Sequence, residues 1–100
     1  MQIAKVLGTV VSTQKEPSLR GGKFLLLQFI DETGQPVPGY EVAMDSVGAG
    51  RGEWVLVSRG SAARQVPGSQ DRPSDAAIVA IIDTVNTDNG MIYSKRDQDR

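Results

Sequence analysis

The pattern of apolar and polar positions predicts a chain that is β-structure almost throughout. Short runs rich in β-branched residues are each bounded by glycine, proline or polar turn residues. The runs that we expect to be strands are 2–13, 23–31, 40–45, 53–59 and 76–87. Asp88-Asn89-Gly90 before a last run, 91–95, is typical of a hairpin turn.

The segments between these runs complete the expected architecture. Gly8 marks a bend or bulge within the first strand, and 60–65 is the one good candidate for a helical turn. Loops are expected at 14–22, 32–39 and 66–75, and the last residues, 96–100, to be frayed. We therefore predict a single all-β domain over 1–100: a small five-stranded, OB-like barrel with one short helix and a C-terminal hairpin, its tail from about residue 91 extended or mobile.

Two of the predicted strands are apolar on both faces. In 23–31 one face holds Leu25, Leu27 and Phe29, and the other holds Phe24, Leu26 and Ile30; in 76–83, Ile78, Ala80 and Ile82 oppose Val79 and Ile81. A barrel interior takes only one face, and leaving the other wet would forgo roughly 1.5–3 kcal/mol for each large side chain. One short helix is too small to cover two strands. We therefore expect a neighbouring subunit to cover them, as in an obligate oligomer.

Composition narrows the function classes. The chain has no cysteine and no histidine, so it lacks thiolate metal ligands, disulfides and the commonest general base. Its formal net charge of −1 offers no electrostatic footprint for nucleic acid or an anionic membrane. No apolar run approaches the roughly 20 residues that span a bilayer, and the N-terminus enters a strand pattern at once. We expect a soluble intracellular protein.

Gly48, Gly50 and Gly52 raise the question of a phosphate-binding loop. Such a loop follows a strand and opens a helix, whereas these glycines precede the strand 53–59. Their spacing also differs from both the dinucleotide and the P-loop patterns. We predict a structural turn.

Other candidate chemistry is weak. The carboxylates nearest apolar strand ends are Asp45, Glu53, Asp75 and Asp83, and no spacing singles out a catalytic or metal-binding pair. Ser61 is expected to be a helix cap, and Arg51, Arg59 and Arg64 to pair on the surface rather than to bind phosphate. Trp54, Tyr40 and Phe29 could stack bases on an OB-like face, although no basic groove accompanies them.

Three separated blocks carry a resemblance that covers nearly the whole chain: GTVVSTQKEPSL (8–19), VGAGRGEWVLVSRGSAAR (47–64) and DAAIVAIIDTV (75–85). In this order and spacing they resemble the EutN/CcmL family of bacterial microcompartment vertex proteins, and its carboxysome members most. The resemblance implies a non-enzymatic structural protein without cofactors, which forms homopentamers at the five-fold vertices of the carboxysome shell in the cytoplasm. That shell encloses the carbon-fixing enzyme and carbonic anhydrase.

The resemblance also implies partners and contact residues. The partners are further copies of the chain and hexameric shell proteins, with no nucleic acid and no membrane. The small-residue stretch Gly60, Ser61, Ala62, Ala63 and Arg64 would lie near subunit contacts or the axial pore, and the glycines would lead into a barrel strand. The alternative that stays open is an OB-like module that binds single-stranded nucleic acid.

Overall fold

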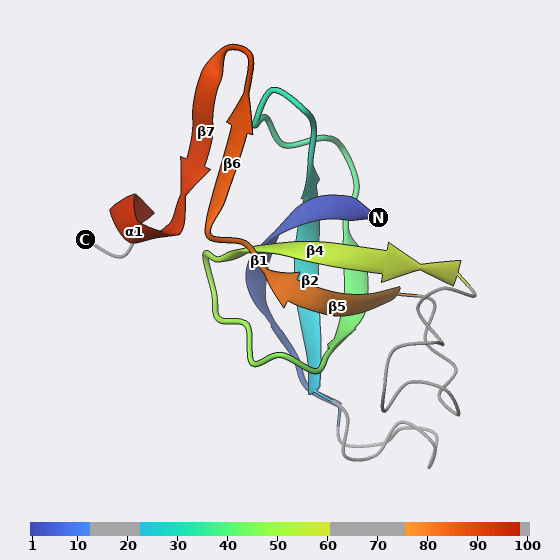
Figure 1. Ribbon diagram of the computed structural model, residues 1–100. Coiled ribbons are helices and arrows are strands. Elements are labelled where there is room, and N and C mark those ends of the chain that lie inside the picture. The colour runs from blue at the N-terminus through green and yellow to red at the C-terminus, as the bar shows by residue number, and fades with distance from the viewer. Residues whose placement is uncertain (13–22, 61–75, 99–100) are drawn as a thin grey trace.

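A closed five-stranded barrel forms the body of the protein (Figure 1). The computed structural model describes residues 1–12, 23–60 and 76–98. The barrel strands are β1 (Gln2–Val10), β2 (Lys23–Ile30), β3 (Glu41–Asp45), β4 (Trp54–Arg59) and β5 (Ala76–Ile81), in the order β1-β2-β3-β5-β4. All neighbours are antiparallel except β3 and β5, which are parallel. The predicted five-stranded barrel is confirmed.

The barrel interior is filled by aliphatic side chains, as the scarcity of aromatic residues requires. Leu25 and Leu27 of β2 point inward and are fully buried, and Leu27 lies opposite the buried Val6 of β1. Phe29 and Ile81 pack against this interior cluster from its ends; its buried members are Ala4, Val6, Leu25, Leu27, Ala43, Ala49, Val55, Val57, Ala76 and Ile78. The expected division of β2 into two faces is therefore present.

Two bulges adjust the register of the barrel. The β1–β2 register shifts between Val6 and Gly8, which confirms the bulge expected at Gly8. The second bulge was not expected: Val57 pairs with Ile78, but Leu56 pairs with Ala80, which leaves Val79 as the extra residue. Beyond Val79 the faces are exchanged, so Ile81 packs on the interior. The prediction that Ala80 and Ile82 lie on the same face of the strand as Ile78 was therefore wrong.

The predicted single strand over 76–87 is also interrupted. β5 ends at Ile81, and a separate sheet is formed by β6 (Thr84–Thr87) and β7 (Gly90–Ser94). The turn at Asp88-Asn89-Gly90 joins them, as its composition predicts. A helical turn, α1 (Lys95–Gln98), follows. The prediction that the chain is frayed from residue 96 was therefore wrong for residues 96–98. The helical turn predicted at 60–65 lies outside the described residues apart from Gly60.

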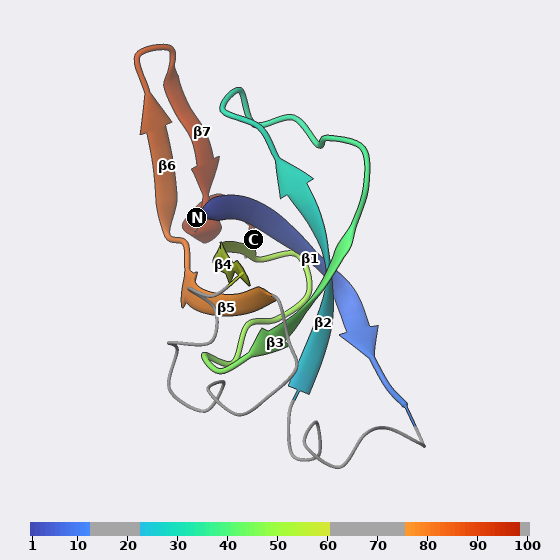
Figure 2. The same ribbon diagram turned by 90° about the vertical axis from the view of Figure 1, so that its right-hand side faces the viewer.

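We call residues 84–98 the arm. The hairpin β6–β7 projects from the end of β5 beyond the barrel, beside the loop that follows β2 (Figures 1 and 2). Within that loop Gly34 approaches the arm so closely that a Cβ there would lie 3.4 Å from the Cβ of Ile92. In the described part of the chain, no helix is long and apolar enough to cross a membrane.

Candidate functional site

The outer face of the barrel carries rows of side chains that run across neighbouring strands. One row joins Leu56, Ile3 and Ile30, in register across β4, β1 and β2. At the other end of the face, Gly8, Leu26 and Val42 form a row over β1, β2 and β3, and Val10, Phe24 and Met44 form the last one. The second apolar face of β2, with Phe24, Leu26 and Ile30, therefore lies on the outside and is half-buried in the chain as described.

The arm covers the first end of this face. Trp54, Ile82 and Tyr93 form a second buried cluster outside the barrel, against which Ile3, Ile30, Leu56, Val85 and Ile92 pack. The arm contributes Tyr93, Val85 and Ile92, while the barrel strands contribute most of the rest. Ile30 packs against this cluster of its own chain but stays half-buried, as Phe24 and Leu26 do, so its place at a subunit contact stays a prediction.

Over the other end of the outer face lies no part of the chain that the structure describes. The side chains at this end are Leu7, Val10, Phe24, Leu26 and Val42, which we call the bare patch. Leu7, Val10 and Val42 are 38%, 39% and 40% exposed, and Phe24 and Leu26 are half-buried. The apolar side of β3 thus faces outward, and its inward positions are Ala43 and Asp45, both buried. Tyr40, just before β3, is 70% exposed.

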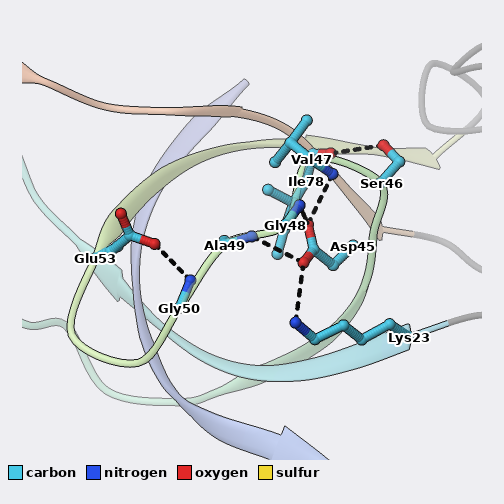
Figure 3. Close-up of polar contacts among 9 residues, drawn as sticks. All are labelled: Lys23, Asp45, Ser46, Val47, Gly48, Ala49, Gly50, Glu53 and Ile78. Atoms are coloured by element: carbon cyan, nitrogen blue, oxygen red, sulfur yellow. Dashed lines mark hydrogen bonds and ion pairs between the residues drawn. The ribbon is translucent and has the colours of Figure 1, made fainter.

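The glycine loop is a structural turn, held at its start by Asp45 (Figure 3). The buried Asp45 carboxylate accepts hydrogen bonds from the backbone N–H groups of Val47 (3.0 Å), Gly48 (3.2 Å) and Ala49 (2.9 Å). Lys23 Nζ lies 3.7 Å from the same carboxylate. The loop then enters β4 rather than a helix, which excludes the phosphate-loop geometry and confirms the predicted turn.

Within this loop the three glycines differ. Gly48 and Gly52 have φ values of +79° and +86°, a region that residues with a Cβ rarely adopt. Gly50 does not share that conformation; its N–H donates to the Glu53 side chain. The loop therefore needs glycine for its backbone conformation at two of the three predicted positions.

Glu53 fixes the end of the loop and ties it to the arm. Its carboxylate lies 2.8 Å from Lys95 Nζ and also accepts the Gly50 N–H. The hydrogen bond from Lys95, and then that from Gly50, lower the pKa of Glu53 below its ordinary value. Asp45 and Glu53 thus both accept hydrogen bonds from backbone N–H groups of the glycine loop. This gives a structural role to two of the four carboxylates considered as catalytic or metal-binding candidates.

The remaining acidic and hydroxyl candidates form no reactive group in the described residues. The Asp83 carbonyl accepts the N–H of Lys95, the first residue of α1, at 2.8 Å. Asp75 and Ser61 lie outside the described residues. Among the described residues, no group of three or more acidic side chains is placed to hold a metal ion.

A shallow hollow of about 420 Å³ lies where β1 begins and β2 ends. Its wall is mainly apolar, with Ile3, Phe29 and Leu56, and it includes Asp31. The Asp31 carboxylate is engaged by its own loop: Thr33 donates from its hydroxyl at 2.7 Å and from its N–H at 2.9 Å, and Gln35 N–H donates at 3.0 Å. These hydrogen bonds, that of the Thr33 hydroxyl first, lower the pKa of Asp31. The hollow thus has mainly apolar walls, and its Asp31 carboxylate is already hydrogen-bonded within its own loop.

Trp54 and Phe29, two of the three aromatic candidates, do not lie together on a surface that could stack bases. Trp54 is buried against Tyr93 in the outer cluster, whereas Phe29 packs at the end of the interior cluster. Arg59 lies over the Phe29 ring at 5.3 Å, donates to Gln2 Oε1 and pairs with Glu41 at 3.8 Å. Arg59 is thus paired on the surface, as expected. Arg51 is exposed, and Arg64 lies outside the described residues.

The small-residue stretch is described only at its start. Gly60 is exposed with φ +64°, while Ser61, Ala62, Ala63 and Arg64 lie outside the described residues. Sequence reasoning missed the arm as a cover and Asp45 as the anchor of the glycine loop. An aspartate followed closely by glycines is a signal for such a side-chain-capped turn.

Comparison with known protein families matches residues 1–83 to the family model described as ethanolamine utilisation protein EutN/carboxysome. The chain is 69% identical to the carboxysome shell vertex protein CcmL of Gloeobacter violaceus, over the full length of both chains. It is 67% identical to the protein of the same name in Nostoc, again over all of both chains. The family model ends at Asp83, immediately before the arm.

Solved structures agree with these matches. The structure of Gloeobacter violaceus CcmL superposes with a TM-score of 0.90 and covers 96% of this chain and 99% of its own. The pentameric microcompartment shell protein GrpN of Rhodospirillum rubrum is 48% identical, with a TM-score of 0.78 over 87% of this chain and 99% of its own. The barrel is therefore one that a pentameric shell protein also has.

Proposed function

Because this chain belongs to the EutN/CcmL family, we propose that it is a carboxysome shell vertex protein, a homopentamer at the five-fold corners of the shell. The observation that carries this function is the identity of 69% to a carboxysome shell vertex protein over the whole of both chains. The pentameric state rests on the likeness to GrpN, a relative described as pentameric. The place of action is the carboxysome shell, within the cytoplasm.

The geometry of a closed shell explains why such a protein is needed. Hexagonal tiles alone form flat sheets or tubes, and a polyhedron closes only where five-fold positions replace six-fold ones. A cyclic pentamer supplies that position through head-to-tail contacts between unlike surfaces, which close on themselves after five copies. We propose that its outer rim contacts hexameric shell proteins.

This role requires no reaction, and we propose that the protein has no catalytic activity and uses no cofactor. The side chains that could have served chemistry support this. Asp45 and Glu53 hold the glycine loop, and Asp31 holds its own turn. The chain has no histidine or cysteine to add a base, a nucleophile or a soft metal ligand.

We also propose that the stretch Gly60 to Arg64 lies at a subunit contact or lines the axial pore. Small side chains allow neighbouring backbones to come close, and a charge placed in such a contact would be unpaired. Ala63→Glu is expected to disturb assembly while circular dichroism shows an intact barrel. An Ala63→Glu pentamer that keeps the mass and stability of the wild type would mean that the stretch faces solvent.

The function is tested by native mass spectrometry of the purified protein and by deleting its gene. We expect a pentamer in solution. In the deletion strain we expect active carbon-fixing enzyme within elongated or unclosed shells under electron microscopy, together with growth that requires added carbon dioxide. Re-expression of the wild-type chain is the control. Normal closed shells and normal growth in air, in a host without a second family member, would refute the vertex role.

A further inference from the structure

We infer that the bare patch is the surface on which a neighbouring copy of this chain packs in the ring. This rests on the proposed function, which supplies the ring; the structure supplies the surface. The patch comprises Leu7, Val10, Phe24, Leu26 and Val42, on the outer face of β1, β2 and β3. Phe24 and Leu26 come from the contact set predicted from the sequence, whereas Ile30, half-buried like them, packs against the arm cluster at the other end of the face.

The first argument is that the outer face has two apolar areas, one on each side of the pair Lys5 and Gln28, and that the arm packs on only one of them. At one end Ile3, Ile30 and Leu56 lie under the arm. Lys5 and Gln28 pair across the middle, and beyond them the face continues with Leu26 and Val10 and nothing over it in the described chain. An apolar area that the described chain leaves exposed on this face indicates a missing partner there.

The second argument concerns where the patch ends. On the β3 side it stops at Met44, which is buried, as is Ala77, its neighbour in β5. On the outer face itself Lys5 is exposed at the middle, whereas Lys23 belongs to the inward side of β2, where it is engaged with Asp45. The patch is thus an uncharged area that is followed on the same face by the polar pair Lys5 and Gln28, as an apolar interface core is followed by polar positions.

The third argument selects the occupant. Interfaces between the subunits of permanent homo-oligomers are the most apolar class, because neither side has to be stable alone in water. The patch contains only aliphatic and aromatic side chains, and GrpN, 48% identical to this chain, is described as pentameric. A second copy of this chain therefore fits the patch better than a reversible shell or cargo contact.

Two valines provide a matched test. Val42, in the patch, is 40% exposed, and Val47, in the glycine loop, is 39% exposed, so both accept a longer side chain in the free subunit. Val47 and Lys23 lie on opposite sides of Asp45, so Val47 points away from β2 (Figure 3). The experiment compares Val42→Lys with Val47→Lys by native mass spectrometry and analytical ultracentrifugation across a concentration series, with circular dichroism as the check on folding.

We expect Val42→Lys to raise the concentration at which the ring dissociates by at least about tenfold, because the charge would enter an apolar contact unpaired. Val10→Lys, on β1, is expected to do the same, and Val47→Lys to leave the wild-type ring. Folded Val42→Lys and Val10→Lys proteins that dissociate as the wild type does would overturn the inference, as would equal loss in Val47→Lys. A wild-type protein that is monomeric would instead refute the proposed pentamer itself.

Discussion

The ring of Trp54 lies against the ring of Tyr93, with centroids 4.4 Å apart and 14° between the ring planes. The backbone N–H of Trp54 also donates to the Tyr93 hydroxyl at 3.3 Å. These residues are the first of β4 and the fourth of β7, so the pair joins the barrel to the arm. It is the centre of the cluster that covers one end of the outer face.

Shortening Tyr93 should therefore release the arm. Tyr93→Phe removes the hydroxyl acceptor and should lower the free energy of unfolding by about 1–2 kcal/mol. Tyr93→Ala should cost about 3–5 kcal/mol, as for other large aromatic side chains. The measurement is urea unfolding at a fixed protein concentration, followed by the fluorescence of Trp54, the only tryptophan. Emission from folded Tyr93→Ala that is not red-shifted would contradict this account of the arm.

Asp45 should be the most sensitive polar residue of the barrel. Asp45→Ala leaves three backbone N–H groups without their acceptor, and we expect the free energy of unfolding to fall by about 3 kcal/mol or more. Lys23→Ala removes only the ion pair at 3.7 Å from a half-exposed lysine, and its cost should stay below about 1 kcal/mol. Equal costs for the two substitutions would show that the ion pair, and not the backbone hydrogen bonds, makes Asp45 important.

In the glycine loop, the cost of a positive φ can be compared with the cost of a steric contact made by an added Cβ. A Cβ at Gly48 would meet no atom within 4 Å, so Gly48→Ala tests the positive φ alone and should cost about 1–2 kcal/mol. Gly50→Ala has no positive φ to overcome, and its Cβ would lie 3.2 Å from the movable Glu53 carboxylate, so its cost should be smaller. Thermal unfolding of the two variants in parallel is the measurement. A greater loss for Gly50→Ala would reverse this order.

The contact between Glu53 and Lys95 should depend on pH. The pKa of Glu53 is lowered in the folded chain, so the contact stabilises it fully above the ordinary value of 4.5, and this stability is lost as the pH falls through the lowered pKa. Both side chains are partly exposed, so Glu53→Gln should cost less than about 1 kcal/mol at pH 7. The difference between wild type and variant should vanish in strong acid.

Urea unfolding between pH 7 and pH 3 measures this difference, and Glu32→Gln, in the exposed loop after β2, is the control. The control should run parallel to the wild type. A difference between wild type and Glu53→Gln that persists unchanged at pH 3 would show that the carboxylate charge is not its cause.

Local signals in the sequence were sufficient for much of the fold. Gly8 marked a bulge because it interrupts a strand rich in β-branched residues, and Asp88-Asn89-Gly90 marked a hairpin because such residues adopt the turn conformations that hairpins need. The second apolar face of β2 was visible because alternation failed there. These features depend on residues close together in the chain.

Features that depend on distant partners were not predictable in the same way. Val79 is the extra residue of a bulge, and the residues before and after it in the sequence are apolar. No polar residue therefore marks the point at which the register changes. Ile30 finds its cover in Tyr93 and the arm, some sixty residues further along the chain. The sequence shows that a surface is apolar, whereas the folded chain decides which part of it stays uncovered.

The parallel seam between β3 and β5 has a consequence for how the barrel folds and opens. Only two residue pairs, Met44 with Ala77 and Asp45 with Ile78, join these strands, and the Ser46 hydroxyl adds a hydrogen bond to the Ile78 carbonyl. We expect β1-β2-β3 and β4-β5 to form first as antiparallel units, because each antiparallel ladder pairs more residues than the two pairs of the seam. In native-state hydrogen exchange, we then expect the hydrogen bonds between β3 and β5 to open before those of the other ladders. The barrel would behave as a curled sheet that is closed by its shortest ladder.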